Sequence, residues 1–244
     1  MKIINDITSF LLPRFCVMCN SRLVGNEKHI CIDCLRQLQR THSHLVDGNP
    51  IEKIFWYHTP IEKAVSWFFY EGENTRHILY EMKDHNKPNI GKYLASIMAE
   101  EIKSTDYFDG IDIIVPVPLH WKRRLKRGYN QSYYIAKGIS EVTGIPVNTN
   151  IIKRTVNNPT QTHLTHSERQ NNVNGIFKLR KPELIEGKHI LLVDDVITTG
   201  ATTIECAKSM MKAQGVRFSV ISLAYAGQHF YINPDNPSAY NQLA

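Results

Sequence analysis

The stretch from residue 191 to 203 constrains the fold of this chain more than any other. It reads Leu-Leu-Val-Asp-Asp-Val-Ile-Thr-Thr-Gly-Ala-Thr-Thr. An apolar run typical of a buried strand ends in two adjacent acids, and a short loop of hydroxyl residues and glycine then opens into a helical pattern. Backbone N–H groups at a helix N-terminus, with the positive end of the helix dipole, form a cradle for phosphate. The stretch therefore predicts a phosphate-binding turn between a strand and a helix.

The side chains of this stretch fit a phosphorylated sugar. Gly200 allows the backbone to approach a ligand closely, and the hydroxyls of Thr198, Thr199 and Thr202 add donors. Paired carboxylates at the carboxyl end of a parallel strand suit the hydroxyls of a ribose, directly or through a metal-bound water. Two acids alone are often a solvated strand end, and a Thr-Thr-Gly turn alone is often only a helix cap. The combination of the two carries the prediction.

Strands and helices alternate along the rest of the chain. Apolar runs predict strands at residues 54–58, 111–117, near 145–152, 189–193 and 218–224. Helical spacing predicts helices from Asn74 to 82, at 89–104, at 131–143 before Gly144, and at 202–214 before Gly215. This order is typical of an α/β domain whose parallel sheet is covered by helices on both faces.

Four of the five cysteines form two C-x2-C knuckles separated by eleven residues: Cys16, Cys19, Cys31 and Cys34. Two facing knuckles complete a tetrahedral S4 site, which suits structural zinc. A module of roughly 30 residues buries little core, so a metal would supply its stability. Alternatives are two disulfides, an iron–sulfur cluster, or one histidine ligand from His29, His42 or His44. Cys206 stands alone in a helical pattern and reads as a small buried apolar residue.

Net charge and apolar content limit the partners and the location. The formal charge is +6, from 29 basic and 23 acidic residues, which favours phosphate esters or nucleic acid. No run approaches the ~20 apolar residues of a membrane span. Asp6 interrupts the N-terminal apolar residues, so we expect a short amphipathic helix packed on the body, with membrane-surface binding as the alternative. We expect a cytoplasmic protein.

A second motif narrows the resemblance to known proteins. Residues 115–131 read Val-Pro-Val-Pro-Leu-His-Trp-Lys-Arg-Arg-Leu-Lys-Arg-Gly-Tyr-Asn-Gln. Residues 191–203 resemble the phosphoribosyl-pyrophosphate (PRPP) signature of class I phosphoribosyltransferases. With residues 115–131 and the four cysteines, the chain resembles the ComF family over residues 13–226. The resemblance implies a class I phosphoribosyltransferase-like sheet with a zinc-ribbon-like module, and Mg²⁺-dependent transfer of a phosphoribosyl group with release of pyrophosphate. It also implies a link to competence and DNA uptake.

The resemblance implies roles for individual residues. Asp194 and Asp195 would act on the ribose as the catalytic pair. The PRPP-binding residues would be Val193, Asp194, Asp195, Thr198, Thr199, Gly200, Ala201 and Thr202. The pyrophosphate loop would be Val117, Pro118 and Leu119. A flexible loop closing over the reacting centre would contribute Arg154, Gln161, Arg169 and Asn172.

Two further features of the resemblance concern basic residues. A basic cluster suits a polyphosphate or a nucleic-acid backbone, or is simply a solvated helix face: Lys122, Arg123, Arg124, Lys126 and Arg127. Lys83 stands where the family carries a lysine after a helix, although Asp84, His85 and Asn86 replace the aromatic residue and glycine expected next.

The sequence predicts three regions and leaves two main functions open. Residues 1–50 would hold the short helix and the zinc module, 51–226 the transferase-type domain with a hood at 51–110, and 227–244 a tail without an assigned function. The alternative to a transferase is a non-catalytic PRPP-binding accessory protein that binds single-stranded DNA or DNA-uptake proteins. In an accessory protein of this kind, bases would stack on three tyrosines, Tyr129, Tyr133 and Tyr134. The alternative is that these tyrosines are ordinary packing residues. A PRPP-sensing transcriptional regulator is the third possibility, but no convincing helix-turn-helix accompanies it.

Overall fold

The computed structural model describes residues 13–84, 87–156, 175–237 and 240–242. Its centre is a sheet of four parallel strands in the order β1-β6-β5-β2. In that order the strands are Ala64–Phe69, Arg217–Tyr225, His189–Ile197 and Ile113–Pro116. The parallel α/β architecture predicted from the sequence is therefore confirmed.

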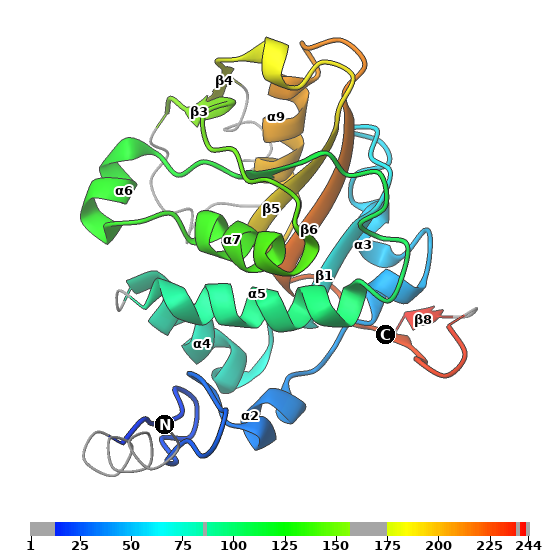
Figure 1. The fold of residues 1–244 in the computed structure, drawn as a ribbon. Helices are drawn as coiled ribbons and strands as arrows, with labels where there is room; N and C mark the ends of the chain where they lie inside the picture. The colour runs from blue at the N-terminus through cyan, green and yellow to red at the C-terminus, as the bar shows by residue number, and fades with distance from the viewer. Residues whose placement is uncertain (1–12, 85–86, 157–174, 238–239, 243–244) are drawn as a thin grey trace.

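Helices lie on both faces of this sheet (Figure 1). On one face α7 packs on β5 and β2, α5 packs on α7, and α4 packs on α5. The other face carries α9 and the short α3. The helices are α3 (Pro50–Lys53), α4 (Gly72–Asp84), α5 (Pro88–Ile102), α7 (Gln131–Thr143) and α9 (Ala201–Met210).

Each face of the sheet has its own hydrophobic core. In β5, Leu191 and Val193 belong to the core under α4, α5 and α7, whereas Ile190 and Leu192 belong to the core under α9 and α3. Successive residues of a strand point to opposite faces, so a strand buried on both sides must be apolar at each position. This explains the uninterrupted apolar run at 190–193.

The contact between α5 and α7 depends on a missing side chain. A Cβ added to Gly138 would lie 2.2 Å from the Lys92 carbonyl oxygen and 2.9 Å from Ala95 Cβ. Only glycine allows the two helix backbones this close. Since α7 also packs on β5 and β2, α5 is held over the same face of the sheet.

Most predicted elements are present, with shifted ends. The helix predicted at 131–143 matches α7, which ends at Gly144 in the left-handed conformation with φ +76°. Strand β5 continues past 193 to Ile197, so the two acids lie inside the strand. Helix α4 starts two residues before Asn74, and α9 ends at Met210, before the predicted 214. Near 145–152 only Val147 bridges to β2, and β3 (Ile152–Arg154) pairs with β4 (Phe177–Leu179) outside the main sheet.

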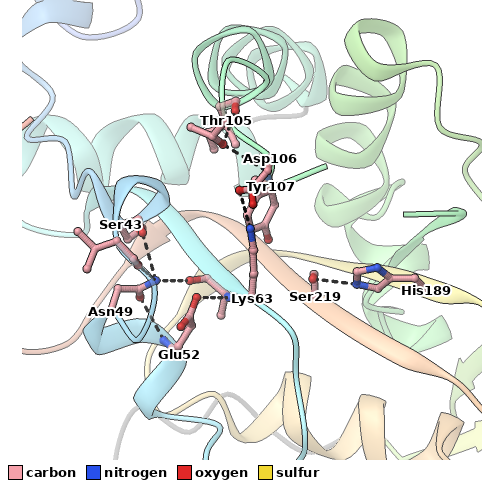
Figure 2. Close-up of polar contacts among 12 residues, drawn as sticks. Ser43, Asn49, Glu52, Lys63, Thr105, Asp106, Tyr107, His189 and Ser219 are labelled. Atoms are coloured by element: carbon pink, nitrogen blue, oxygen red, sulfur yellow. Dashed lines mark hydrogen bonds and ion pairs between the residues drawn. The ribbon is translucent and has the colours of Figure 1, made fainter. Parts of the chain in front are cut away.

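The strand predicted at 54–58 is wrong. Asn49 starts α3 by accepting from the N–H groups of Ile51 and Glu52, and its amide donates to the carbonyls of Ser43 (3.1 Å) and Ala64 (3.0 Å) (Figure 2). Residues 54–58 then continue as turns. Their apolar side chains divide between core and solvent, because Phe55 is 1% exposed and the two residues after it 54% and 91%.

The stretch 51–110, predicted as a hood, also builds the body of the domain. It contains β1, which pairs with β6 at the sheet edge, and α5, which packs on α7. A polar contact drawn in Figure 2 joins the segment before β1 to the first residue of that strand. Glu52 Oε1 accepts from the Ala64 N–H at 3.3 Å. The hood itself stays a prediction.

The remaining elements are short. They are α2 (Ile32–Gln37), η1 (Ser43–Leu45), α6 (Trp121–Arg127), η2 (Pro182–Leu184), β7 (Phe230–Ile232) and β8 (Tyr240–Gln242). Strands β7 and β8 pair antiparallel in the tail, and Phe230 and Ile232 are buried in the core under α9.

Some predictions lie outside the described residues. These are the amphipathic helix of the first twelve residues and three residues of the flexible loop, Gln161, Arg169 and Asn172. None of the helices in the described part of the chain combines the length and the apolar character needed to cross a bilayer.

Candidate functional site

The two adjacent acids lie near the carboxyl end of β5, between the ends of β6 and β2. Asp194 pairs in register with Ser222 of β6, and the preceding Val193 pairs with Pro116 at the end of β2. Carboxyl ends of parallel strands share one edge of a sheet, where open α/β sheets bind ligands. The loops that follow β5 and β2 therefore leave the sheet side by side.

Asp194 has an unusual proton affinity. Burial, followed by the negative charge of Asp195, raises its pKa to about 7. Its Oδ1 accepts hydrogen bonds from Ser132 Oγ at 3.2 Å and from the Asp195 N–H at 2.9 Å. Both bonds favour the ionised form but do not offset the burial. Near neutral pH this carboxyl group therefore exchanges between its protonated and ionised forms.

Lys83 supplies the positive charge of the site. Its Nζ lies 2.8 Å from Asp195 Oδ2, with the side chains 26% and 17% exposed. Burial acts to lower the pKa of Lys83, but the carboxylates of Asp195 and Asp194 more than offset it, and the pKa is raised. The lysine reaches the acids from the last turn of α4, despite the mismatch in the residues that follow it.

The loop after β5 leaves the N-terminus of α9 open. Residues 198–200 are a bend, the N-cap residue of α9 is Gly200, which makes no side-chain cap, and the first turn contains no acidic residue. Gly200 has φ +68°, and a Cβ there would lie 2.8 Å from Ile54 Cγ2. Thr198 is exposed, while Thr199 and Thr202 are partly exposed. Uncapped N–H groups and accessible hydroxyls at one helix end can bind an anion.

The loop after β2 is tied to the same edge. The Val117 N–H donates to the Val193 carbonyl at 2.9 Å, and Asn130 Nδ2 donates to the Val117 carbonyl at 3.0 Å. The first of these bonds continues the β2–β5 pairing. The second holds the loop 117–119 against the start of α7.

Two residues at this edge of the sheet were not predicted from the sequence as site residues. Ser132 bonds Asp194, and Asn130 bonds the 117–119 loop. Both stand in or next to the Gly-Tyr-Asn-Gln end of the second motif, at the start of a predicted helix. Their position in that motif was the available signal.

Arg154 lies in the electrostatic field of the acids. Burial and then the nearby Arg123 lower its pKa, and Asp194 opposes this shift. Its guanidinium carbon is 5.7 Å from the centre of the Phe177 ring, and its buried Nε has no hydrogen-bond partner in the described structure. Arg154 and Arg123, predicted in two separate motifs, thus come together near Asp194.

The basic cluster forms the exposed helix α6. Figure 1 shows α6 at the left edge of the molecule, and none of its residues is buried. Trp121 and Leu125, one turn apart, are 58% and 74% exposed. The helix starts at His120, whose Nδ1 accepts from the Lys122 N–H at 3.3 Å, and ends at Gly128 with φ +83°.

The four clustered cysteines can hold a metal ion. Their sulfur atoms lie within 4.8 Å of one another, and the group includes no histidine among the described residues. All four thiols are free, so the disulfide alternative does not apply to this structure. Hydrogen bonds from Ser21 lower the pKa of Cys19 to about 6, whereas burial raises the pKa of Cys31 and Cys34.

Backbone N–H groups point at the sulfurs of this cluster. Cys16 Sγ accepts from the N–H groups of Met18 and Cys31, both at 3.4 Å, and Cys31 Sγ accepts from the Cys34 N–H at 3.5 Å. Such donors stabilise thiolate charge around a metal. The three buried cysteines also belong to the core under α4, α5 and α7, so the module packs against the main domain.

Comparison with known proteins agrees with this arrangement. The family model described as "Phosphoribosyl transferase domain" matches residues 85–240. The DNA utilization protein YhgH of Escherichia coli K12 is 29% identical over 200 residues, covering 81% of this chain and 84% of its own. Competence protein F of Haemophilus influenzae is 29% identical, covering 87% and 85%. Competence protein ComFC of Bacillus subtilis is 26% identical, covering 82% and 78%.

Proposed function

The chain belongs to the phosphoribosyl transferase domain family, and from this premise we propose that it binds PRPP and transfers its phosphoribosyl group to an acceptor, releasing pyrophosphate. The observation that carries the proposal is the common edge of β5 and β2. There the acids Asp194 and Asp195, the uncapped start of α9 and the loop 117–119 meet. A sugar that carries a phosphate at one end and a pyrophosphate at the other needs these three kinds of group.

Each part of PRPP has a partner in this proposal. The N–H groups of the first turn of α9 and the hydroxyls of Thr198, Thr199 and Thr202 bind the phosphate ester, with Val193, Gly200 and Ala201 shaping the turn. The carboxylates of Asp194 and Asp195 accept from the ribose hydroxyls. The loop Val117, Pro118 and Leu119 contacts the pyrophosphate. Lys83, Arg154 and Arg123 add positive charge around it.

The acids also fit the Mg²⁺ that accompanies PRPP in this proposal. Magnesium takes oxygen ligands, usually one or two carboxylates together with substrate phosphates, and Asp194 and Asp195 offer such oxygens. Bound with PRPP, the ion would neutralise charge on the departing pyrophosphate. The chain's own contribution is to orient the ribose through the two carboxylates and to exclude water from it.

A structural zinc in the cysteine module is the second part of the proposal. A tetrahedral Zn–S site with bonds of about 2.3 Å places its sulfurs about 3.8 Å apart. Cys19 Sγ and Cys31 Sγ lie 3.7 Å apart, which supports such a site. Four sulfur ligands leave no open position, so the zinc would stabilise the module without taking part in transfer.

A phosphorus NMR time course tests the transferase. Purified protein with PRPP and Mg²⁺ is followed against a panel of nucleobases and a short single-stranded DNA. We expect pyrophosphate with one acceptor, and a loss of at least ~100-fold in its rate in the Asp194→Asn, Asp195→Asn double variant, because the ribose loses its charged acceptors.

The control for this experiment is Asp112→Asn. Asp112 is exposed directly before β2, beside the amino end of β5 and thus at the opposite edge of the sheet. The side-chain oxygen of an asparagine at this position can still accept from the His189 N–H. Its rate should match that of the unchanged protein. PRPP signals that broaden without being consumed, whatever the acceptor, would refute catalysis and leave only binding.

A PRPP-binding accessory protein that binds single-stranded DNA is the second candidate. The observation that favours it is α6, an exposed helix with five basic residues and two exposed apolar ones. We expect affinity for a single-stranded oligonucleotide to fall with salt. The Arg123→Ala, Arg124→Ala double variant should bind the oligonucleotide ~10-fold more weakly. The slope of log affinity against log salt concentration should become shallower by about 1.4, because each of the two lost phosphate contacts contributes about 0.7.

Fluorescence anisotropy across a salt series measures both quantities. The matched control is the Lys212→Ala, Arg217→Ala double variant, which removes the same charge from exposed positions away from α6. An equal loss of affinity in both double variants would mean that net charge, rather than α6, accounts for the binding. Binding that does not change with salt would exclude this function.

A further inference from the structure

A cavity of about 320 Å³ lies at the carboxyl end of β2, and neither acid lines it. Its walls include Pro116 at the end of β2, Pro118 and Leu119 of the loop that follows, and Thr149 of the segment after α7. That segment bridges β2 through Val147, on the edge opposite to β5: Ile114 of β2 pairs with Val147 on one side and with Leu191 on the other. The wall formed by Thr149 therefore lies across β2 from Asp194.

Three tyrosines line the cavity together. Tyr129 and Tyr133 each meet the Tyr134 ring nearly edge to face, with ring centres 5.6 Å apart in both pairs. Tyr129 is 7% exposed and its hydroxyl donates to the Met82 carbonyl, while the other two rings are partly exposed. The rings are thus held before any ligand arrives. Aromatic walls of this kind accept a flat ring by stacking or edge contact.

The charged groups at this cavity favour an anion. Arg124, exposed on α6, is part of its lining, and no acidic residue is, among the described residues. Asn130 also lines it, and makes no side-chain cap at the start of α7, whose first turn contains no acid. An aromatic wall beside an arginine matches a ligand that joins a flat ring to a phosphate.

We propose that this cavity is a nucleotide site. The base packs against Tyr133 and Tyr134, and the phosphate pairs with Arg124. The volume lies at the low end of the 300–1,000 Å³ common for small-molecule sites, which limits the occupant to about one nucleotide unit. A free nucleotide and one residue of a single strand share this chemistry. The cavity shares Pro118 and Leu119 with the proposed pyrophosphate loop. Tyr133, Tyr134 and Arg124 are outside the proposed PRPP contacts, so this proposal does not depend on PRPP binding.

Isothermal titration calorimetry with AMP, adenosine and an eight-residue oligothymidylate tests the proposal. The titrations use the Asp194→Asn, Asp195→Asn double variant as background, so that failure of the transferase proposal has no bearing on the result. We expect one AMP per chain. In that background, Tyr133→Ala should weaken AMP and adenosine by about tenfold, and Tyr133→Phe should bind like the background, because the ring carries the contact.

Arg124→Ala separates the phosphate from the base. It should weaken AMP by about tenfold and leave adenosine unchanged, whereas Arg217→Ala, a like charge at the amino end of β6, should change neither. Binding of AMP without the oligonucleotide supports the site with a free nucleotide as its ligand, and binding of the oligonucleotide without AMP supports it with a single strand. Binding of both supports the site for either source. No binding of either, or equal affinities in the Tyr133→Ala, Arg124→Ala and background proteins, would overturn it.

Discussion

Replacing Cys34 by serine is expected to abolish metal binding and to loosen the N-terminal module. The four sulfurs lie within 4.8 Å of one another, and a hydroxyl in place of a thiolate removes one of four ligands. Structural zinc in small modules supplies ~10–16 kcal/mol of apparent binding free energy, which is also folding free energy. Metal analysis should fall from one zinc per chain to none.

The main domain should also lose stability, because the module shares its core. Cys16, Cys31 and Cys34 belong to the same hydrophobic cluster as α5 residues such as Leu94, and His29 packs against the Tyr93 ring with centres 5.8 Å apart. We expect the melting temperature to fall by roughly 6–12 °C, which corresponds to about 3 kcal/mol of lost packing at 2–4 °C per kcal/mol. Proteolysis should then begin within residues 13–40.

Cys206→Ala is the matched control, since it also removes one buried thiol. Cys206 lies in α9, outside the cysteine cluster. Its zinc content should equal that of the unchanged protein, although its melting temperature can shift through packing alone. An unchanged protein that purifies without zinc and gains no stability when zinc is added would disprove the proposed centre.

Replacing Lys83 by methionine is expected to lower the free energy of unfolding by about 3 kcal/mol at pH 8. Both members of the pair with Asp195 are mostly buried, and breaking buried ion pairs costs about 3–5 kcal/mol because the remaining charge is left without a partner. Here two adjacent carboxylates would remain together without a cation. Urea unfolding at fixed pH measures the change.

The effect of Lys83→Met should be smaller at pH 5. The pKa of Asp194 is raised from 3.8 to about 7, so between these values the folded protein holds a proton at Asp194 that the unfolded chain has released. The stability contributed by this group therefore falls as pH rises through that window. Lys83 acts to lower the pKa of Asp194. Its loss therefore raises this pKa further and increases the stability lost as the pH rises from 5 to 8. At pH 5 the protonated Asp194 no longer repels Asp195.

Lys103→Met removes a matched cation from an exposed pair. Lys103 Nζ lies 2.5 Å from Glu100 Oε2, and the two side chains are 48% and 55% exposed. Its loss should cost no more than about 1 kcal/mol. If Lys83→Met lowers the free energy of unfolding equally at pH 5 and pH 8, the inference that Lys83 lowers the pKa of Asp194 is wrong.

Elements defined by local chemistry were predictable from the sequence. The bounds of α7 follow from an apolar stripe and from Gly144, and the turn before α9 follows from its glycine and hydroxyl residues. The clustering of the four cysteines also follows from spacing alone. In each case the residues that decide the structure are neighbours in the chain.

The strand predicted at 54–58 failed for the opposite reason. Its apolar composition is that of a strand, but Asn49 directs the chain into α3 through bonds to the carbonyls of Ser43 and Ala64. The strand of this region forms at Ala64–Phe69 because its partner is β6, near the other end of the chain. Sheet pairing of this kind depends on which strand lies alongside, and periodicity does not contain that information.

The sequence by itself determined the α/β class, the strand–turn–helix that carries the two acids, and the clustering of the four cysteines, because each depends on residues a few positions apart. Only the tertiary structure decided that Lys83 pairs with Asp195, that Arg154 meets Arg123 near Asp194, and that the tyrosines after α6 line a cavity with Arg124. These groups come from separate elements: Lys83 from α4, which packs on α5, Arg154 from β3, Arg123 from α6, and Tyr133 and Tyr134 from α7, which packs on the sheet. At Asp194 the fold also sets the proton affinity, since burial, followed by the charge of Asp195, raises the pKa of its carboxyl group.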